Sequence, residues 1–205
     1  MIIHRIHLHH ISLPYVHPFE TSFGRELSRE AILVAVESDG LLGWGECVAG
    51  RGPWYSYETI GTAWHVLVDF LAPALLGQQI DQPSDVVARF SRVRGHAMAR
   101  ASLENALWDL FGRAQGRSLG EMLGGVRPAV PVGVSVGIEP TLEELLAQVE
   151  GYVAAGYARV KLKIKPGWDV QVVRAVRERW PDLALQVDAN SAYTLADAAR
   201  LAELD

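Results

Sequence analysis

The second half of the chain alternates strand-like and helix-like segments three times, and this alternation constrains the fold more than any other feature. The three apolar runs with strand composition are VPVGVSVGI (130–138), ARVKLKI (158–164) and LALQVDA (183–189). Each is followed by a helix signal: a capping box at Thr141–Glu144, a helix pattern over 169–179, and a helix cap at Thr194–Asp197. Strand–helix–strand order requires parallel strands joined by right-handed crossovers, and such sheets are buried on both faces. A parallel α/β sheet is therefore predicted.

The first half reads as a small sheet followed by helices. Strands are predicted over 2–13 and 31–37, and a turn at Ser38-Asp39-Gly40 leads into LLGWGEC. Two segments have loop composition, 17–24 and 49–57. Helices are predicted over 58–76, 84–93 and 97–115, and Gly116 is placed to end the last of them. The pattern indicates an α+β unit that precedes the parallel sheet.

Composition excludes several classes of protein. The 205 residues carry 19 Lys+Arg against 24 Asp+Glu, a net charge of −5, so no basic excess exists for binding nucleic acid or acidic membranes. No apolar run reaches the roughly 18 residues of a membrane span, and the N-terminus lacks the apolar core of a signal peptide. Cys47 is the only cysteine, which excludes an internal disulfide. We therefore expect a cytoplasmic protein that binds neither nucleic acid nor membrane.

Two lysines stand inside the second predicted strand. Because strand side chains alternate, Lys161 and Lys163 share one face, and the apolar residues between and beside them share the other. If the apolar face covers helices, both ammonium groups point to the opposite side, which in a closed barrel is the interior. Burying them is unfavourable unless an anion is nearby, which indicates a functional site. The alternative is an exposed edge strand, on which lysines prevent aggregation.

Polar residues lie near the ends of the predicted strands. Asp188 follows LALQV, Asn190 comes two residues later, and Ser135 lies near the end of the first strand. The C-terminal ends of parallel strands are where α/β enzymes hold metals and ligands. Taken singly, Asp188 or Asn190 could instead cap a loop or a helix. Their shared placement favours a site at this end of the sheet.

Two groups in the first half are weaker candidates. Five of the seven histidines fall within the first 17 residues: His4, His7, His9, His10 and His17. Imidazole binds metals, but H-x-H on a strand without cysteines or nearby acids is more typical of a solvated strand face.

Trp54 and Tyr55 stand in a polar Gly/Pro loop, a position suited to substrate contact.

Specific motifs connect these observations to a family. VKLKIKPGWD (160–169) and VDANSAYT (187–194) resemble the enolase superfamily, and within it the group of o-succinylbenzoate synthases and N-acylamino acid racemases. HPFETSFG, WGEC, MARASLENALWDL and LGEMLGG in the first half are similar to that group's capping domain. The resemblance implies an α+β capping domain over residues 1–128. Residues 129–205 would follow as about three βα units, the first part of an enolase-type, TIM-like α/β barrel.

The resemblance also implies a chemistry. Such enzymes bind a small carboxylate substrate on a divalent metal, Mg²⁺ or another such as Mn²⁺, and a lysine removes the proton α to the carboxylate to give an enediolate. Carried over, Lys163 is the acid/base lysine, Lys161 contacts the substrate carboxylate, and Asp188 is a metal ligand. The residues implied to line the substrate pocket are Ser135, Asn190, Phe19, Phe23, Trp54 and Tyr55. The group's reactions are dehydration to o-succinylbenzoate, in menaquinone biosynthesis, and racemisation of N-acylamino acids. Its complete enzymes are expected to be homo-oligomers.

The resemblance implies missing parts as well. A closed barrel needs about 250 residues, whereas the chain after Pro128 has room for three strands. The family's other acidic metal ligands, and the lysine on the opposite substrate face, would lie on strands after Asp205. One carboxylate holds Mg²⁺ poorly against its hydration shell, so we expect the 205-residue chain alone to be inactive. Two alternatives stay open. One is a truncated or split fragment that binds a carboxylate or a partner chain, and the other is an unrelated α/β domain that binds anions through the two lysines.

Overall fold

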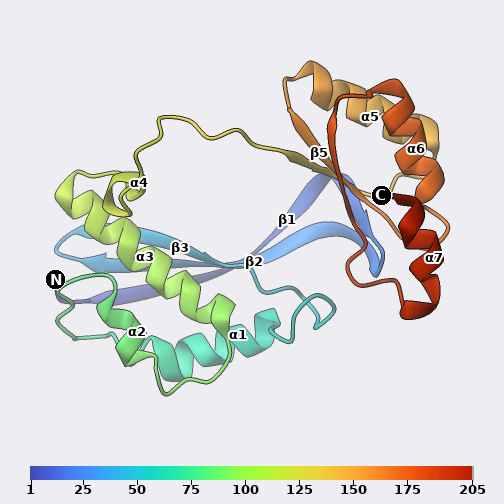
Figure 1. The fold of residues 1–205 in the computed structure, drawn as a ribbon. Helices are drawn as coiled ribbons and strands as arrows, with labels where there is room; N and C mark the ends of the chain where they lie inside the picture. Colours follow the sequence, from blue (N-terminus) through green and yellow to red (C-terminus); the bar gives the residue numbers. More distant parts are fainter. Residues whose placement is uncertain (205) are drawn as a thin grey trace. The chain divides into compact units, whose positions relative to one another are not determined.

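The computed structural model describes residues 1–204. Contacts divide the chain into two compact units, each of which combines segments that are distant in sequence (Figure 1). The first unit contains Met1–Pro14 and Ser28–Arg127. The second contains Tyr15–Leu27 together with the chain from Pro128 onward. A short segment from the first half of the sequence thus packs with the second half.

Three strands form the sheet of the first half, and two of them are longer than predicted. β1 (Arg5–Thr21) and β2 (Gly24–Ser38) form a long hairpin, and β3 (Leu41–Cys47) follows. The strands lie in the order β1-β2-β3, and β2 pairs antiparallel with β3. The predicted turn between the second and third strands is confirmed, with Gly40 in the left-handed region at φ +78°.

The loop predicted over residues 17–24 is wrong. The two strands continue into this segment and leave only a tight turn at its end. Thr21 donates from its hydroxyl to the carbonyl oxygen of Gly24 at 3.3 Å. The backbone N–H of Ile138 donates to the carbonyl oxygen of Glu20 at 3.0 Å. The local composition is typical of a loop, but pairing across the hairpin and this contact with the second half of the chain impose the strand form.

The helices of the first unit are α1 (Ile60–Val66), the π-helical η1 (Leu67–Leu71), α2 (Asp85–Arg89), α3 (Ala97–Gln115) and α4 (Leu119–Met122). The bounds of α3 are as predicted, and it ends at Gly116 with φ +64°. The helix predicted over 58–76 is shorter because Pro73 has no N–H to continue it. The helix predicted over 84–93 is also shorter, because the residues after Arg89 form turns. Among the residues that the structure describes, no helix is both long and apolar enough to cross a membrane.

Helix α3 lies along β3 in the first unit, and two glycines on the strand permit the close approach (Figure 1). A Cβ atom at Gly43 would lie 2.1 Å from the carbonyl oxygen of Ala106. A Cβ atom at Gly45 would lie 2.0 Å from the carbonyl oxygen of Ser102. Both distances are far below van der Waals contact, so these positions require glycine. The buried core of this unit includes Val34, Val36, Leu103, Leu107 and Leu110.

The second unit contains the parallel sheet that the alternation predicted. β4 (Val134–Val136), β5 (Arg159–Lys163) and β6 (Ala184–Asp188) lie in the order β4-β5-β6, and both neighbouring pairs are parallel. The crossovers contain α5 (Leu142–Ala154) and α6 (Val170–Arg179). The chain after β6 forms η2 (Leu195–Asp197), α7 (Ala198–Leu201) and η3 (Ala202–Leu204). β4 is shorter than predicted because Pro131 and two glycines interrupt the apolar run.

The predicted helix starts and the apolar face of β5 are confirmed. Thr141 accepts a hydrogen bond from the backbone N–H of Glu144, and Thr194 forms a full capping box with Asp197. Val160, Leu162 and Ile164 are almost completely buried in a core that also contains residues of α5 and α6. The alternation therefore directs the lysines of β5 to the face that does not cover this core.

Replacing Gly45 by Ala should destabilise the first unit. The added methyl group would overlap the backbone of α3, and overpacking of this kind costs about 3 kcal/mol. Gly61→Ala is the matched control, because Gly61 is exposed on α1 and a Cβ there meets only the Thr59 hydroxyl at 3.9 Å. Urea unfolding measures both free energies. Equal stability of the two variants would contradict the close packing of α3 on β3.

Candidate active site

Two lysines of β5 converge on one carboxylate of β6. In the parallel register Lys163 lies opposite Asp188, and Lys161 lies between Ser135 on β4 and Gln186 on β6. The Nζ atom of Lys163 lies 2.8 Å from Oδ2 of Asp188, and the Nζ atom of Lys161 lies 3.0 Å from the same oxygen. The structure therefore brings together the three charged residues that the sequence selected.

The environment of Asp188 strongly favours its ionised form. Hydrogen bonds from Lys163 and Lys161 to Oδ2, and from the backbone N–H of Asn190 to Oδ1 at 3.0 Å, hold the pKa of this carboxyl group well below its ordinary value. The bond from Lys163 is the largest contribution, and partial burial opposes it. One carboxylate balances only one of the two ammonium groups, so the cluster keeps a net positive charge that suits an anionic ligand.

Asn190 contacts the same amine from the loop that follows β6. Its Oδ1 accepts a hydrogen bond from Nζ of Lys163 at 2.7 Å. Its backbone has φ +48° and that of Ser191 has φ +64°, so two consecutive residues adopt the left-handed conformation. Ser135 lies exposed at its register position on β4. The structure thus brings Asn190 into contact with Lys163. It places Ser135 opposite Lys161 in the register of β4 and β5.

The tip of the β1–β2 hairpin reaches the ends of all three parallel strands. Besides the Glu20–Ile138 bond near β4, the carboxylate of Glu20 pairs with Nζ of Lys165 beyond β5 at 3.0 Å. The hydroxyl of Ser22 donates to the carbonyl oxygen of Ala189 beyond β6 at 2.7 Å. These three attachments hold the hairpin tip against the C-terminal ends of the parallel strands. Sequence reasoning missed these contacts. The only available signal was the opposite charge of Glu20 and Lys165.

The predicted aromatic residues fall into two places. Phe19 lies beside the end of β4, where a Cβ added to Gly137 would meet its ring at 3.5 Å. Phe23 is half exposed at the hairpin turn. Trp54 and Tyr55 lie in the first unit, in the predicted loop, and both are 76% exposed. The structure therefore brings Phe19 and Phe23 to the second unit, whereas a role for Trp54 and Tyr55 in the pocket stays a prediction.

The donor chemistry of this cluster fits part of a divalent metal site. Asp188 offers carboxylate oxygens and Asn190 an amide oxygen, which are the hard ligands that Mg²⁺ prefers. Within residues 1–204, however, no group of three or more His, Cys, Asp or Glu side chains is placed to hold a metal ion.

Four of the five N-terminal histidines lie on β1, and His4 precedes it. His7 stacks on His9 with ring centroids 6.4 Å apart, and His9 stacks in turn on Trp44. His7 lies 3.5 Å from a carboxylate oxygen of Glu37, and His10 lies 3.0 Å from one of Glu30. Each pair joins one imidazole to one carboxylate.

A buried ion-pair network joins the two family motifs, and sequence reasoning missed it. Asp169, which ends VKLKIKPGWD, is 1% exposed and accepts hydrogen bonds from the guanidinium of Arg200 at 2.6 and 2.7 Å. It also accepts one from the hydroxyl of Tyr193, in VDANSAYT, at 2.7 Å. These bonds, chiefly that from Arg200, lower the pKa of Asp169 to about 2. Burial and the neighbouring carboxylate raise the pKa of Tyr193, which keeps its hydroxyl protonated as a donor.

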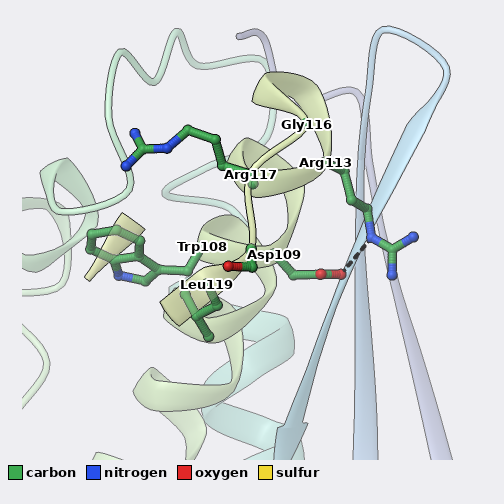
Figure 2. A pocket seen from close by; sticks show the side chains of 8 residues that line it. Trp108, Asp109, Arg113, Gly116, Arg117 and Leu119 are labelled. Carbon is green, nitrogen blue, oxygen red and sulfur yellow. Dashed lines mark hydrogen bonds and ion pairs between the residues drawn. The ribbon is translucent and has the colours of Figure 1, made fainter. Parts of the chain in front are cut away.

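A separate pocket lies at the C-terminal end of α3 in the first unit. Figure 2 shows its lining, with Trp108 and Leu119 on one side and the ion pair of Asp109 with Arg113 on the other. Its volume is about 350 Å³. The pocket includes none of the predicted site residues, so it gives no support to the chemistry argued from the lysines.

Comparison with known proteins identifies relatives across the whole chain. Residues 6–124 match the family model of the mandelate racemase / muconate lactonizing enzyme N-terminal domain, and residues 144–204 match that of the enolase C-terminal domain-like family. An o-succinylbenzoate synthase of Geobacillus kaustophilus is 50% identical over 199 residues, which are 97% of this chain and 53% of that protein. An N-succinylamino acid racemase of Amycolatopsis is 48% identical, over 98% of this chain and 55% of that protein.

A solved structure agrees with these sequence matches. A protein of Listeria innocua, described as a member of the enolase superfamily, superimposes with a TM-score of 0.92 at 40% identity. The match covers all of this chain and 55% of that one. The chain thus spans about half the length of the relatives that it matches.

Replacing Asp169 by Asn should change how stability depends on pH. Because folding lowers the pKa of Asp169 to about 2, its ionised form stabilises the fold fully above a pH of about 5, and this contribution is lost as the pH falls toward 2. Between these pH values the unaltered chain should lose about 2 kcal/mol more than Asp169→Asn. Urea unfolding at each pH measures the difference, with the exposed Asp182→Asn as control. Parallel curves for the unaltered chain and Asp169→Asn would contradict the network.

Proposed function

Because the chain belongs to the enolase superfamily, as its motif pair predicted, we propose that it carries one half of a site for metal-dependent removal of the proton α to a carboxylate. The observation that carries the proposal is the meeting of Lys161, Lys163 and Asp188 at the C-terminal ends of neighbouring parallel strands. Ligands and catalytic groups of α/β barrels lie at this end of the strands. Family relationship and local geometry thus support the same chemistry.

The three residues have different roles in this proposal. Lys163 is the general base, and its Nζ is aimed by Asn190 and Asp188. Lys161 is more exposed than Lys163, and it binds the carboxylate of the substrate. Asp188 is a ligand of a divalent cation, Mg²⁺ or Mn²⁺, which when bound supplies the positive charge that stabilises the enediolate.

The proposed substrate is a small carboxylate that carries a succinyl group. The names of the two relatives above, o-succinylbenzoate synthase and N-succinylamino acid racemase, share that group. Both dehydration and racemisation begin with loss of a proton next to a carboxylate, so one lysine can serve either reaction. Ser135, Asn190, Phe19, Phe23, Trp54 and Tyr55 are proposed to line the pocket. We place the reaction in the cytoplasm and expect the complete enzyme to be a homo-oligomer.

We further propose that the 205 residues alone do not catalyse the reaction. The described part of the chain offers one carboxylate to the metal, and a single carboxylate competes poorly with water for Mg²⁺. The relatives are nearly twice as long as this chain, and we propose that the missing ligands come from the part of such proteins that this chain does not cover. Catalysis therefore requires this half of the site to be joined to a second half.

Exchange of the α-proton tests the role of Lys163. One enantiomer at a time of an N-succinylamino acid is incubated with Mg²⁺ in D₂O, and loss of the α-proton signal is followed by NMR. The chain is assayed alone, and also continued by the remaining half of the Geobacillus kaustophilus relative. We expect exchange only from the continued chain. Lys163→Ala should reduce it at least about 100-fold for the enantiomer whose proton faces this lysine.

Lys165→Ala is the matched control for this experiment. It removes a neighbouring ammonium group that pairs with Glu20 instead of Asp188, and it should keep most of the rate. An equal loss in Lys163→Ala and Lys165→Ala would overturn the role of Lys163. Exchange by the 205-residue chain alone would refute its proposed inactivity. Thermal stabilisation by sulfate without any effect of Mg²⁺ would favour an anion-binding domain instead.

A further inference from the structure

The buried carboxylate of Asp169 ties together three segments of the second unit. Its Oδ1 accepts from the backbone N–H of Val170 at 2.7 Å and thereby caps α6. The guanidinium of Arg200 brings in α7, and the hydroxyl of Tyr193 brings in the loop after β6. A carboxylate buried to this extent persists only when its oxygens are fully hydrogen-bonded, so each of these segments is held at a fixed place.

The loop that Tyr193 ends is also the loop that carries Asn190. Its near end is fixed by Asp188, whose Oδ1 accepts the N–H of Asn190. Its middle contains two left-handed residues, Asn190 and Ser191, a conformation that non-glycine residues keep only when their surroundings determine it. The far end of this five-residue segment, 189–193, is fixed by the bond from Tyr193 to Asp169.

We propose that Tyr193 and Asp169 are positioning residues, which hold segment 189–193 so that Oδ1 of Asn190 stays on the amine of Lys163. The inference rests on the proposed function for the importance of that amine. Neither residue touches the amine or a reacting atom. Both act through the backbone of the loop: a hydrogen bond joins Tyr193 to Asp169, the chain itself links Tyr193 to Asn190, and a hydrogen bond joins Asn190 to Lys163.

Tyr193→Phe isolates this effect from the stability of the fold. The ring can keep its place in the core of the second unit, and only the hydroxyl is lost. Asp169 keeps its bonds from Arg200 and Val170, so no uncompensated charge is buried. Tyr152→Phe is the matched control, because Tyr152 also packs against this core but lies on α5.

Two readouts on the 205-residue chain test the proposal without catalysis. Amide hydrogen exchange should become at least about tenfold faster over residues 189–193 in Tyr193→Phe, and should stay unchanged over β5. Acylation of lysine amines, quantified by mass spectrometry, should rise about threefold at Lys163 relative to Lys165, because one of its hydrogen bonds is weakened. Tyr152→Phe should change neither readout. Asp169→Asn is a second variant that should loosen the same five residues.

The outcomes separate this inference from the proposed function. Unchanged exchange over 189–193 in Tyr193→Phe would overturn the anchoring of the loop. A loosened loop with unchanged reactivity of Lys163 would overturn its effect on the amine. Equal effects of Tyr193→Phe and Tyr152→Phe would show that the Tyr193 hydroxyl contributes only to general packing of the core. That result would also overturn the proposal. If both readouts are as expected while the continued chain exchanges no α-proton, the positioning stands and the proposed function fails.

Discussion

The candidate site depends on one interaction, in which two ammonium groups share a single carboxylate. Parallel pairing sets Lys163 opposite Asp188, and the alternation of β5 places Lys161 on the same face. The opposite face of the strand is buried in the apolar core, so the lysines have no other side to occupy. The low pKa of Asp188 and the contact from Asn190 follow from this arrangement, which concentrates positive charge where the strands end.

Around this cluster, the structure uses contacts between distant segments to fix the shape of the site. Glu20 and Ser22 of the β1–β2 hairpin contact the ends of the parallel strands, although more than one hundred residues separate them from those strands. Asp169 accepts a hydrogen bond from Tyr193, at the far end of the loop after β6. Each attachment is a hydrogen bond or ion pair to a segment that follows one of the parallel strands, and the neighbours of the Lys163 amine are Asp188 and Asn190.

The parts of the structure that the sequence predicted depend on local, periodic signals. Alternation in β5 correctly assigned the two faces of that strand, and capping residues such as Thr141 and Thr194 correctly marked helix starts. The extended hairpin, the Glu20–Lys165 pair and the Asp169–Tyr193 bond were not predicted, because each joins residues that no local pattern relates. Pro73 is a local signal that the prediction did not use. A proline interrupts a helix, but the helix was predicted through Pro73 because the surrounding residues are apolar.

The most direct test of this account is the titration of Asp188 in the 205-residue chain, followed by NMR of its side-chain carboxyl carbon and assigned through Asp188→Asn. If both lysines share this carboxylate, the signal should stay that of the ionised form through the ordinary titration range of aspartate near about 3.9, and Lys161→Met combined with Lys163→Met should return it to that range. An Asp188 carboxyl group that titrates normally in the unaltered chain would show that Lys161 and Lys163 do not contact it. That result would contradict the proposed site.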